Sequence, residues 1–465
     1  MNYISTRNKN NIYTFKDALY QGLAADGGLL LPEKIPSITI QELEMMSGGS
    51  YIDIASKIIV RYWEDLDDKI LKVLLSKSYS TFANKQIVPV IKLGEFYIAE
   101  LFYGPTLAFK DLAMQFLGNL LEYINIEDGK SINILGATSG DTGSAAIYSV
   151  KGKEHIKIFI LYPNRAISKI QELQMVTHND RNIEAIAVEG SFDDCQYILK
   201  SIFMDNNFKK TYNIIAVNSI NWVRILAQVV YYFYIYLSIV KKREIGKLLN
   251  FSVPTGNFGN VFAGYIAKKM GLPIDKLVIA TNENDILKNF VSNGVYEIKK
   301  VTKTYSPSMD ITVASNFERY LYYLLDENDS EVVKYMDKLK QVSRVTVDKS
   351  LLEKVSDDFF AESTSNMETI NTIVEVFKKY NYIVDPHTAC GVNAYWKLSE
   401  FLKTDTVCLA TAHHAKFPEV VERAIGQNIS YPESIKELFD KEKHFTVFSN
   451  DEKPVKDYIL KKALV

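Results

Sequence analysis

The chain has 465 residues, more than one ordinary hydrophobic core accommodates, so we expect two or three domains. Its 54 basic and 56 acidic residues give a formal net charge of −2, and this balance argues against nucleic acid or an anionic membrane surface as a partner. The three cysteines, Cys195, Cys390 and Cys408, are odd in number and far apart. They indicate a reducing compartment and offer neither a disulfide framework nor the spacing of a metal site, so we expect no metal.

The N-terminal segment has neither the basic-then-apolar pattern of a signal peptide nor the Arg- and Ser-rich pattern of a transit peptide. Residues 1–95 are turn-rich, with a helical pattern around Tyr51–Trp63, and we predict a separate N-terminal region there. The run Trp222–Val240 is apolar enough to suggest a membrane span, but Arg224 and Gln228 interrupt it. A buried core helix is therefore the better interpretation, and we expect a cytoplasmic protein without membrane contact.

After the N-terminal region, short apolar runs alternate with helical patterns, which predicts parallel sheets covered by helices on both faces. We predict two α/β domains, residues 96–215 and 216–465, that exchange strands. The charge-rich stretch Val301–Glu362 is predicted to be a helical insertion or covering structure. The predicted strands are Ser131–Leu135, Ile156–Leu161, Ile183–Val188, Ile214–Val217, Phe251–Val253, Leu277–Ala280 and Thr406–Ala410.

Lys110 lies in the segment Tyr103–Asp111, where a Gly-Pro pair is followed by a small apolar run typical of a helix start. We expect this lysine to point into the protein, where burial disfavours its charged form. A buried lysine is suited to form a Schiff base with an aldehyde cofactor. The ordinary alternative for any single lysine is a place on the solvent face of an amphipathic helix.

The loop Leu135–Ser144 connects a predicted strand to a predicted helix over Ser144–Val150. Its small residues let a ligand approach the backbone, and the free N–H groups of a helix start suit an anion such as a carboxylate. The hydroxyl groups of the loop, on Thr138, Ser139 and Thr142, are further donors. A simple tight turn is the ordinary alternative.

A second loop, Val253–Asn260, also connects a predicted strand to a predicted helix, over Val261–Lys269. Its two glycines and its place at a helix N-terminus favour a phosphate site. It is not a Walker loop, since no Gly-Lys-Ser/Thr follows, and it does not match the spacing of a dinucleotide fingerprint.

Thr411 follows the predicted strand Thr406–Ala410, and a hydroxyl at a strand end can bind a neutral ring nitrogen. His413 and His414 stand close by and would suggest a metal site. Adjacent side chains in an extended segment point to opposite faces, however, and no carboxylate cluster accompanies them. A metal is therefore the poorer interpretation.

In this order the four segments resemble the threonine synthases, pyridoxal-phosphate enzymes of the fold type II that also includes tryptophan synthase β chains and threonine deaminases. The resemblance covers essentially the whole chain. Within the family, the chain looks like the bacterial and fungal branch. The resemblance implies two doubly wound parallel-sheet domains with the cofactor in the cleft between them, besides the N-terminal region. The further matching segments are Tyr3–Arg7, Asp26–Leu29, Ser306–Ile311, Ser315–Arg319 and Asp385–Thr388.

The resemblance also implies roles for single residues. Lys110 matches the lysine that holds pyridoxal 5'-phosphate and then shuttles protons between substrate carbons. Thr411 matches the hydroxyl partner of the pyridine nitrogen, and Asp141 stands where related enzymes place an asparagine near the ring hydroxyl. The implied cofactor-binding residues are Lys110, Asp141, Gly256, Asn257, Phe258, Gly259, Asn260 and Thr411.

The segment Asn218–Arg224 resembles the substrate-phosphate site of that family. The planar fork of Arg224 suits a phosphate monoester, and Arg224 needs a partner because it lies in the most apolar helix of the chain. A surface ion pair is the ordinary alternative for this arginine. The implied substrate-binding residues are Thr138, Ser139, Thr142, Asn218, Ser219 and Arg224.

The implied reaction converts O-phospho-L-homoserine and water to L-threonine and phosphate by β,γ-elimination and hydration, in a monomer or homodimer. A phospho-lyase that releases 2-oxobutyrate would keep every phosphate contact and is the closest alternative. A serine or threonine deaminase would not need Arg224, and a cofactor-free binding scaffold would not need Lys110. Three positions depart from the family pattern without removing a reactive group: Asn8, Ala25 and His414.

Overall fold

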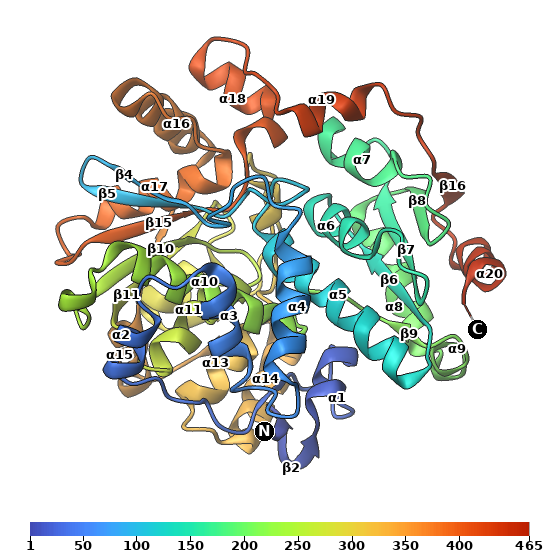
Figure 1. Cartoon of the computed structure of the whole chain (residues 1–465), viewed down its shortest axis with the longest axis horizontal. Helices are drawn as coiled ribbons and strands as arrows, with labels where there is room; N and C mark the ends of the chain where they lie inside the picture. The colour runs from blue at the N-terminus through green and yellow to red at the C-terminus, as the bar shows by residue number, and fades with distance from the viewer. Residues whose placement is uncertain (465) are drawn as a thin grey trace.

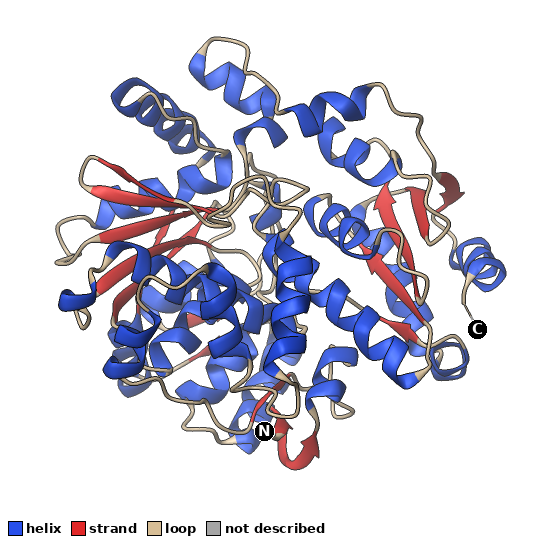
Figure 2. Cartoon of the chain, viewed as in Figure 1, coloured by secondary structure: helices blue, strands red, loops and turns tan. Residues whose placement is uncertain are grey.

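Two sheets organise the computed structural model, which describes residues 1–464 (Figure 1). The larger sheet has six strands, in the order β14 (Phe359–Ser363), β11 (Ile274–Thr281), β10 (Leu249–Pro254), β15 (Thr406–Ala410), β5 (Phe96–Glu100) and β4 (Val90–Leu93). The smaller has five, in the order β16 (Thr446–Ser449), β8 (Ile183–Glu189), β7 (Ile156–Pro163), β6 (Ile132–Ala137) and β9 (Ile214–Ile215). All neighbouring strands are parallel except β4 and β5. Figure 2 shows the two sheets as separate groups of strands with helices around them.

Helices cover both sheets and fill the space between them. In the first half of the chain they are α1 (Phe15–Tyr20), α2 (Ile40–Met46), α3 (Tyr51–Ile59), α4 (Asp68–Tyr79), α5 (Lys110–Asp128), α6 (Asp141–Val150), α7 (Lys169–Val176), α8 (Phe192–Met204), α9 (Asn206–Thr211) and α10 (Trp222–Ile239). In the second half they are α11 (Gly259–Lys269), α12 (Ile286–Asn293), α13 (Phe317–Leu324), α14 (Asp329–Val342), α15 (Lys349–Asp358), α16 (Asn366–Tyr380), α17 (Pro386–Leu398), α18 (Pro418–Ile425), α19 (Glu433–Phe439) and α20 (Glu452–Lys462). Short 3-10 turns are η1 (Lys242–Glu244), η2 (Pro307–Met309) and η3 (His414–Lys416).

Every strand predicted from the sequence is confirmed, with ends that differ by a few residues. The apolar run at Trp222 is also confirmed as a core helix, because 83% of its apolar window is buried inside the protein. It packs against α3, α5 and α11, so hydrophobic burial and not a bilayer covers its side chains.

The charge-rich stretch Val301–Glu362 is only partly the helical cover that we predicted. It contains α13, α14 and α15, but it ends in β14, which pairs with β11 as an edge strand of the larger sheet. The prediction of covering structure is therefore wrong for β14. Its sequence, Phe-Phe-Ala-Glu-Ser, is short and half polar, which is a weak strand pattern.

The domain limits at residues 95 and 215 stay predictions, but the sheets cross them. β5 lies after the first limit, yet it pairs with β15 in the larger sheet. β16 lies near the C-terminus, yet it pairs with β8 in the smaller sheet. Residues 96–100 and 446–449 therefore belong to the opposite half from the one that these limits give, as an exchange of strands requires.

The N-terminal residues form a small sheet, β2 (Asn8–Tyr13), β1 (Tyr3–Ser5) and β3 (Leu30–Pro32), which packs on the rest of the core. A second small pair, β12 (Val295–Glu297) and β13 (Arg344–Thr346), lies beside α12 and α14. Arg319 of α13, fully buried, joins the N-terminal sheet to the loop before α10 by donating to the backbone oxygens of Leu30 and Ile220. The N-terminal region thus fixes the loop that precedes α10.

Candidate active site

A cavity of about 590 Å³ lies where the carboxyl ends of the parallel strands face one another. This volume is typical of a site for a small ligand or cofactor. Its walls come from the loops after β6, β9, β10 and β15, together with α5, α10 and the turn around η2. Every site residue predicted from the sequence lines it: Lys110, Thr138, Ser139, Asp141, Thr142, Asn218, Ser219, Arg224, Gly256, Asn257, Phe258, Gly259, Asn260 and Thr411.

Lys110 is the first residue of α5, and the backbone before it is tied to the strand end at Thr411. The N–H of Phe109 donates to the Thr411 carbonyl oxygen at 2.8 Å, and Ala108 bridges to Ala412. The Lys110 side chain is 12% exposed, and its Nζ lies 3.4 Å from Asp141 Oδ2. Burial lowers the pKa of Lys110, against the opposite effect of Asp141. A lysine with a lowered pKa is available as a neutral nucleophile and base.

The loop after β6 is held mainly by Thr138. Its Oγ1 accepts hydrogen bonds from the N–H groups of Gly140 and Gly143, at 3.0 and 2.9 Å. The structure thus corrects the expectation that the amides of this loop are free, since two of them are already used. α6 also begins at Asp141, earlier than predicted, with Gly140 as its N-cap at φ 136°. A side chain at Gly140 would collide with Gln171, so glycine is required there.

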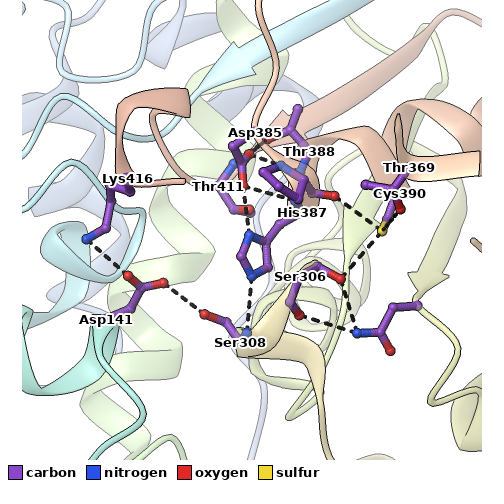
Figure 3. A network of polar contacts seen from close by, with 12 residues as sticks. Asp141, Ser306, Ser308, Thr369, Asp385, His387, Thr388, Cys390, Thr411 and Lys416 are labelled. Atoms are coloured by element: carbon purple, nitrogen blue, oxygen red, sulfur yellow. Dashed lines mark hydrogen bonds and ion pairs between the residues drawn. The ribbon is translucent and has the colours of Figure 1, made fainter. Parts of the chain in front are cut away.

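Asp141 is a buried carboxylate with four donors around it. Figure 3 shows two of them, Lys416 and Ser308. Asp141 Oδ1 accepts a hydrogen bond from Gln171 Nε2 at 2.9 Å and forms an ion pair with Lys416 Nζ at 3.0 Å. Asp141 Oδ2 accepts a hydrogen bond from Ser308 Oγ at 2.9 Å and a longer one from Lys110 Nζ. Burial alone would raise the pKa of Asp141, but the two lysines outweigh it and hold this pKa well below its usual range. Asp141 is therefore a fixed anion beside Lys110.

The loop after β10 offers neutral donors at the start of α11. Phe258 takes a left-handed backbone at φ 64°, while its buried ring packs on Phe317, so only its backbone faces the cavity. Asn260 Oδ1 accepts from the hydroxyls of Tyr231 and Tyr232, which leaves its buried Nδ2 without a partner among residues 1–464. Together with the first N–H groups of α11, this amide forms a cradle for an anion.

Arg224, 4% exposed, lies on the face of α10 that borders the cavity. Its Nη1 makes one long contact of 3.4 Å to the Val217 carbonyl oxygen, and its Nε has no partner in the described chain. Burial lowers its pKa to about 10, with no acidic neighbour to oppose this. The surface ion pair considered for this arginine is therefore excluded within residues 1–464, and its guanidinium is available to an anionic ligand.

The other predicted substrate residues lie at this end of the cavity. Ser219 Oγ is 2.8 Å from Ser315 Oγ, which in turn donates to Asn257 Oδ1. Asn218 is exposed and uses its Oδ1 to accept from the Ile220 N–H. The structure brings these residues together, while their individual roles stay predictions.

Thr411 lies at the end of β15 and is 5% exposed. Its N–H donates to Thr388 Oγ1 at 3.2 Å, and its hydroxyl makes no hydrogen bond within residues 1–464. Thr388 belongs to the cap of α17, where Asp385 accepts from the Thr388 N–H and its carboxylate also contacts His387 Nδ1 at 2.7 Å. The free Thr411 hydroxyl is therefore held at the cavity by a rigid helix cap (Figure 3).

Four residues at the site were missed as site residues by the sequence analysis. Gln171 on α7 and Lys416 in η3 hold Asp141, while Ser308 in η2 donates to it. His387 Nε2 accepts from the Ser308 N–H at 3.2 Å. Lys416, Ser308 and His387 stand in segments that resemble the family, which was the only signal, whereas Gln171 lies in an ordinary helical pattern.

These residues fit pyridoxal phosphate. Lys110 supplies a buried amine, the unpaired Asn260 Nδ2 and the amides of α11 suit the cofactor phosphate, and the free Thr411 hydroxyl suits a neutral ring nitrogen. Arg224 then remains for a second anion. The fit rests on unpaired donors that the protein itself leaves in one cavity.

Comparison with known proteins agrees with this site. Models described as threonine synthase N terminus, pyridoxal-phosphate dependent enzyme and threonine synthase C-terminal match residues 2–79, 87–412 and 388–459. The chain is 42% identical to a threonine synthase of Pseudomonas aeruginosa, over 99% of this chain and 98% of that protein. It is 45% identical to one of Saccharomyces cerevisiae, over 94% and 93%. The crystal structure of pyridoxal-phosphate-bound threonine synthase from Brucella melitensis has a TM-score of 0.96 and 40% identity, with full coverage of both chains.

Proposed function

Because the chain belongs to the threonine synthase family of pyridoxal-phosphate-dependent lyases, we propose that its substrate is O-phospho-L-homoserine, which it converts with water to L-threonine and phosphate. The threonine synthase reaction and the cofactor come with the family. The substrate and the role of each residue are the proposal.

The observation that carries the proposal is the pairing of two unlike anion sites in one cavity. Asn260 and the start of α11 offer neutral donors, which suit a cofactor phosphate. Arg224 offers a buried, unpaired guanidinium, which suits a second phosphate carried by the substrate. A deaminase acting on an unphosphorylated amino acid would leave this guanidinium buried without a counter-charge, which is costly.

The cavity residues have separate roles in binding and in proton transfer. Arg224, with Asn218 and Ser219, binds the substrate phosphate, and the loop Thr138–Thr142 binds the substrate carboxylate through its remaining donors. The amine of Lys110, held 3.4 Å from Asp141, removes and returns protons at the substrate carbons. Pyridoxal phosphate supplies an aldehyde and an electron-accepting ring that stabilises negative charge on those carbons. The Thr411 hydroxyl would hold the ring nitrogen as a neutral acceptor, which would moderate this electron withdrawal.

One assay separates the alternatives. The purified protein is incubated with O-phospho-L-homoserine, and phosphate, threonine and 2-oxobutyrate are measured in the same samples. We expect phosphate and threonine in equal amounts. Phosphate with 2-oxobutyrate and no threonine would replace the synthase with the phospho-lyase, and no product of either kind would reject the substrate.

We also propose that the protein acts in the cytoplasm as a monomer or homodimer. The near-neutral net charge and three buried free cysteines support a reducing, aqueous compartment. Light scattering of the purified protein measures the oligomeric state, and fractionation of the source cells measures the location.

A further inference from the structure

Lys416 is a second buried lysine of the site, and it differs from Lys110 in having three oxygens close to its amine. Its side chain is 0% exposed. Its Nζ lies 2.7 Å from the Thr106 carbonyl oxygen, 3.0 Å from Gln174 Oε1 and 3.0 Å from Asp141 Oδ1. The first two contacts are hydrogen bonds and the third is an ion pair, so three oxygens surround the ammonium group.

An ammonium group held by three oxygens cannot bind a substrate phosphate without loosening one of these contacts. Lys416 is also absent from the walls of the cavity. Two of its contacts nevertheless reach the machinery around Lys110. Thr106 belongs to the turn that leads into α5, and Asp141 is the carboxylate beside the Lys110 amine.

Lys110 and Lys416 both lie beside the Asp141 carboxylate, and the distances show that Lys416 is the nearer ion-pair partner. Lys416 lies 3.0 Å from Oδ1, whereas Lys110 lies 3.4 Å from Oδ2. Gln171 and Ser308 occupy further positions on the two oxygens. The carboxylate therefore already has an ion-pair partner in Lys416, which is nearer to it than Lys110.

We propose that Lys416 is a positioning residue that fixes and charge-balances Asp141, so that Asp141 does not hold Lys110 as a protonated ion-pair partner. The Lys110 amine is then available for the cofactor aldehyde and for proton transfer. This inference rests on the proposed role of Lys110 as the cofactor lysine.

None of the other charged groups around Lys110 replaces Lys416 as the ion-pair partner of Asp141. Arg224 on α10 faces Lys110 and disfavours its protonated form, as Lys416 does. His387 on α17 faces Asp141. Asp111, on the same helix as Lys110, is engaged by the Thr106 N–H and hydroxyl. Without Lys416, Lys110 would be the only cation in contact with Asp141.

The test is the rate at which the full-length protein, freed of cofactor, takes up pyridoxal phosphate at a series of pH values. Only a neutral amine attacks the aldehyde, so the rate follows the neutral fraction of Lys110 and the visible band of the bound cofactor reports it. In Lys416→Met we expect the pH midpoint to rise by about one unit or more, because an uncompensated carboxylate within about 4 Å favours the charged lysine. Below the midpoint, uptake should be about tenfold slower.

Lys153→Met is the matched control. Lys153 is also a buried lysine, and its Nζ contacts Asn119 Oδ1 at 2.7 Å and Glu122 Oε2 at 2.8 Å, away from the cavity. It should lower the melting temperature and leave the pH midpoint unchanged. If Lys416→Met behaves in the same way, with a lower melting temperature and an unshifted midpoint, Lys416 is only structural and the inference is overturned.

Asp141→Asn tests the inference without removing Lys416. It deletes the negative charge and keeps an amide in its place, so the pH midpoint should fall, opposite to the shift expected for Lys416→Met. An unchanged midpoint in Asp141→Asn would overturn the inference even if Lys416→Met fails to fold. A protein that forms no band, or that still forms it in Lys110→Ala, would instead reject the proposed function.

Discussion

Two regions beside Lys110 each contain a buried cation, Lys416 behind the cavity wall and Arg224 in it, but they treat it differently. At one end, Lys416 has three oxygens within 3.0 Å, one of them from a carboxylate. At the other end, Arg224 has one carbonyl contact of 3.4 Å and a buried Nε without a partner in the described chain. Both residues are almost fully buried, so exposure alone does not distinguish them.

The difference separates structural from ligand-binding charges. A buried charge is expensive unless it is paired and hydrogen-bonded, so a protein that leaves one unpaired keeps it for another molecule. Lys416 meets this requirement inside the fold, whereas Arg224 meets it only when an anion enters the cavity. Lys110 lies between the two ends and has one long contact, which suits a group that has to react.

Replacing Lys110 tests the group between the two ends and should have the largest effect. Lys110→Ala should abolish turnover and the visible cofactor band, because no other lysine of the cavity wall lies at the buried position beside Asp141. The Arg224 end should still bind the substrate, which calorimetry can measure. Lys200→Ala, at the rim of the same cavity, is the control and should retain most of the activity.

Replacing Arg224 tests the unpaired end. Arg224→Ala should raise KM for O-phospho-L-homoserine by roughly 100-fold, as expected for the loss of a buried charge contact, and should leave the cofactor bound. Steady-state kinetics and the visible absorbance of the same samples measure both quantities. Arg224→Lys keeps the charge without the fork and should fall between the two. Loss of the cofactor in Arg224→Ala would show that the two phosphate sites are assigned the wrong way round.

Local patterns indicated Lys110, the loop Gly256–Asn260 and Thr411 as candidates, because each lies at a junction of a strand, turn or helix that its own residues specify, and the family resemblance then implied their roles. The contacts around Lys416 could not be predicted from local patterns. Its contacts join η3 to α7, to the turn at Thr106 and to Asp141, which are far apart in the sequence.

The sheets show the same limit. The strands with continuous apolar runs, such as β7 and β11, were predicted, since burial on both faces requires such runs. The edge strands β14 and β16 are half polar, and their places depend on partners from distant segments. Edge position and strand exchange are properties of the topology, which no local pattern records.

Replacing Asn260 tests the neutral donors of the cofactor site, with a smaller effect. Asn260→Asp keeps the acceptor for Tyr231 and Tyr232 but places negative charge where the unpaired Nδ2 stood. The cofactor should bind about 10- to 100-fold more weakly, through a lost donor and added repulsion, as titration of its absorbance would show. Asn393→Asp, a buried asparagine outside the cavity, is the control, and equal weakening there would indicate a general loss of stability.

His178 makes the Lys416 end more acid-sensitive than the Arg224 end, and this is the smallest effect that we predict. His178 follows α7, which carries Gln171 and Gln174, and its ring packs on Tyr148 while Nδ1 stays without a hydrogen bond.

Burial lowers the pKa of His178 from 6.5 to about 4. The unfolded chain therefore binds a proton more readily than the folded one between these values, so the stabilisation is complete above pH 6.5 and is lost as the pH falls towards 4. Over the part of this range between pH 6.5 and pH 5, the loss amounts to about 2 kcal/mol. His178→Gln removes the titrating ring, and its urea unfolding free energy should fall less between pH 7.5 and pH 5 than that of the unmodified protein. Parallel pH dependences of the two proteins would show that the proton on His178 does not weaken this end.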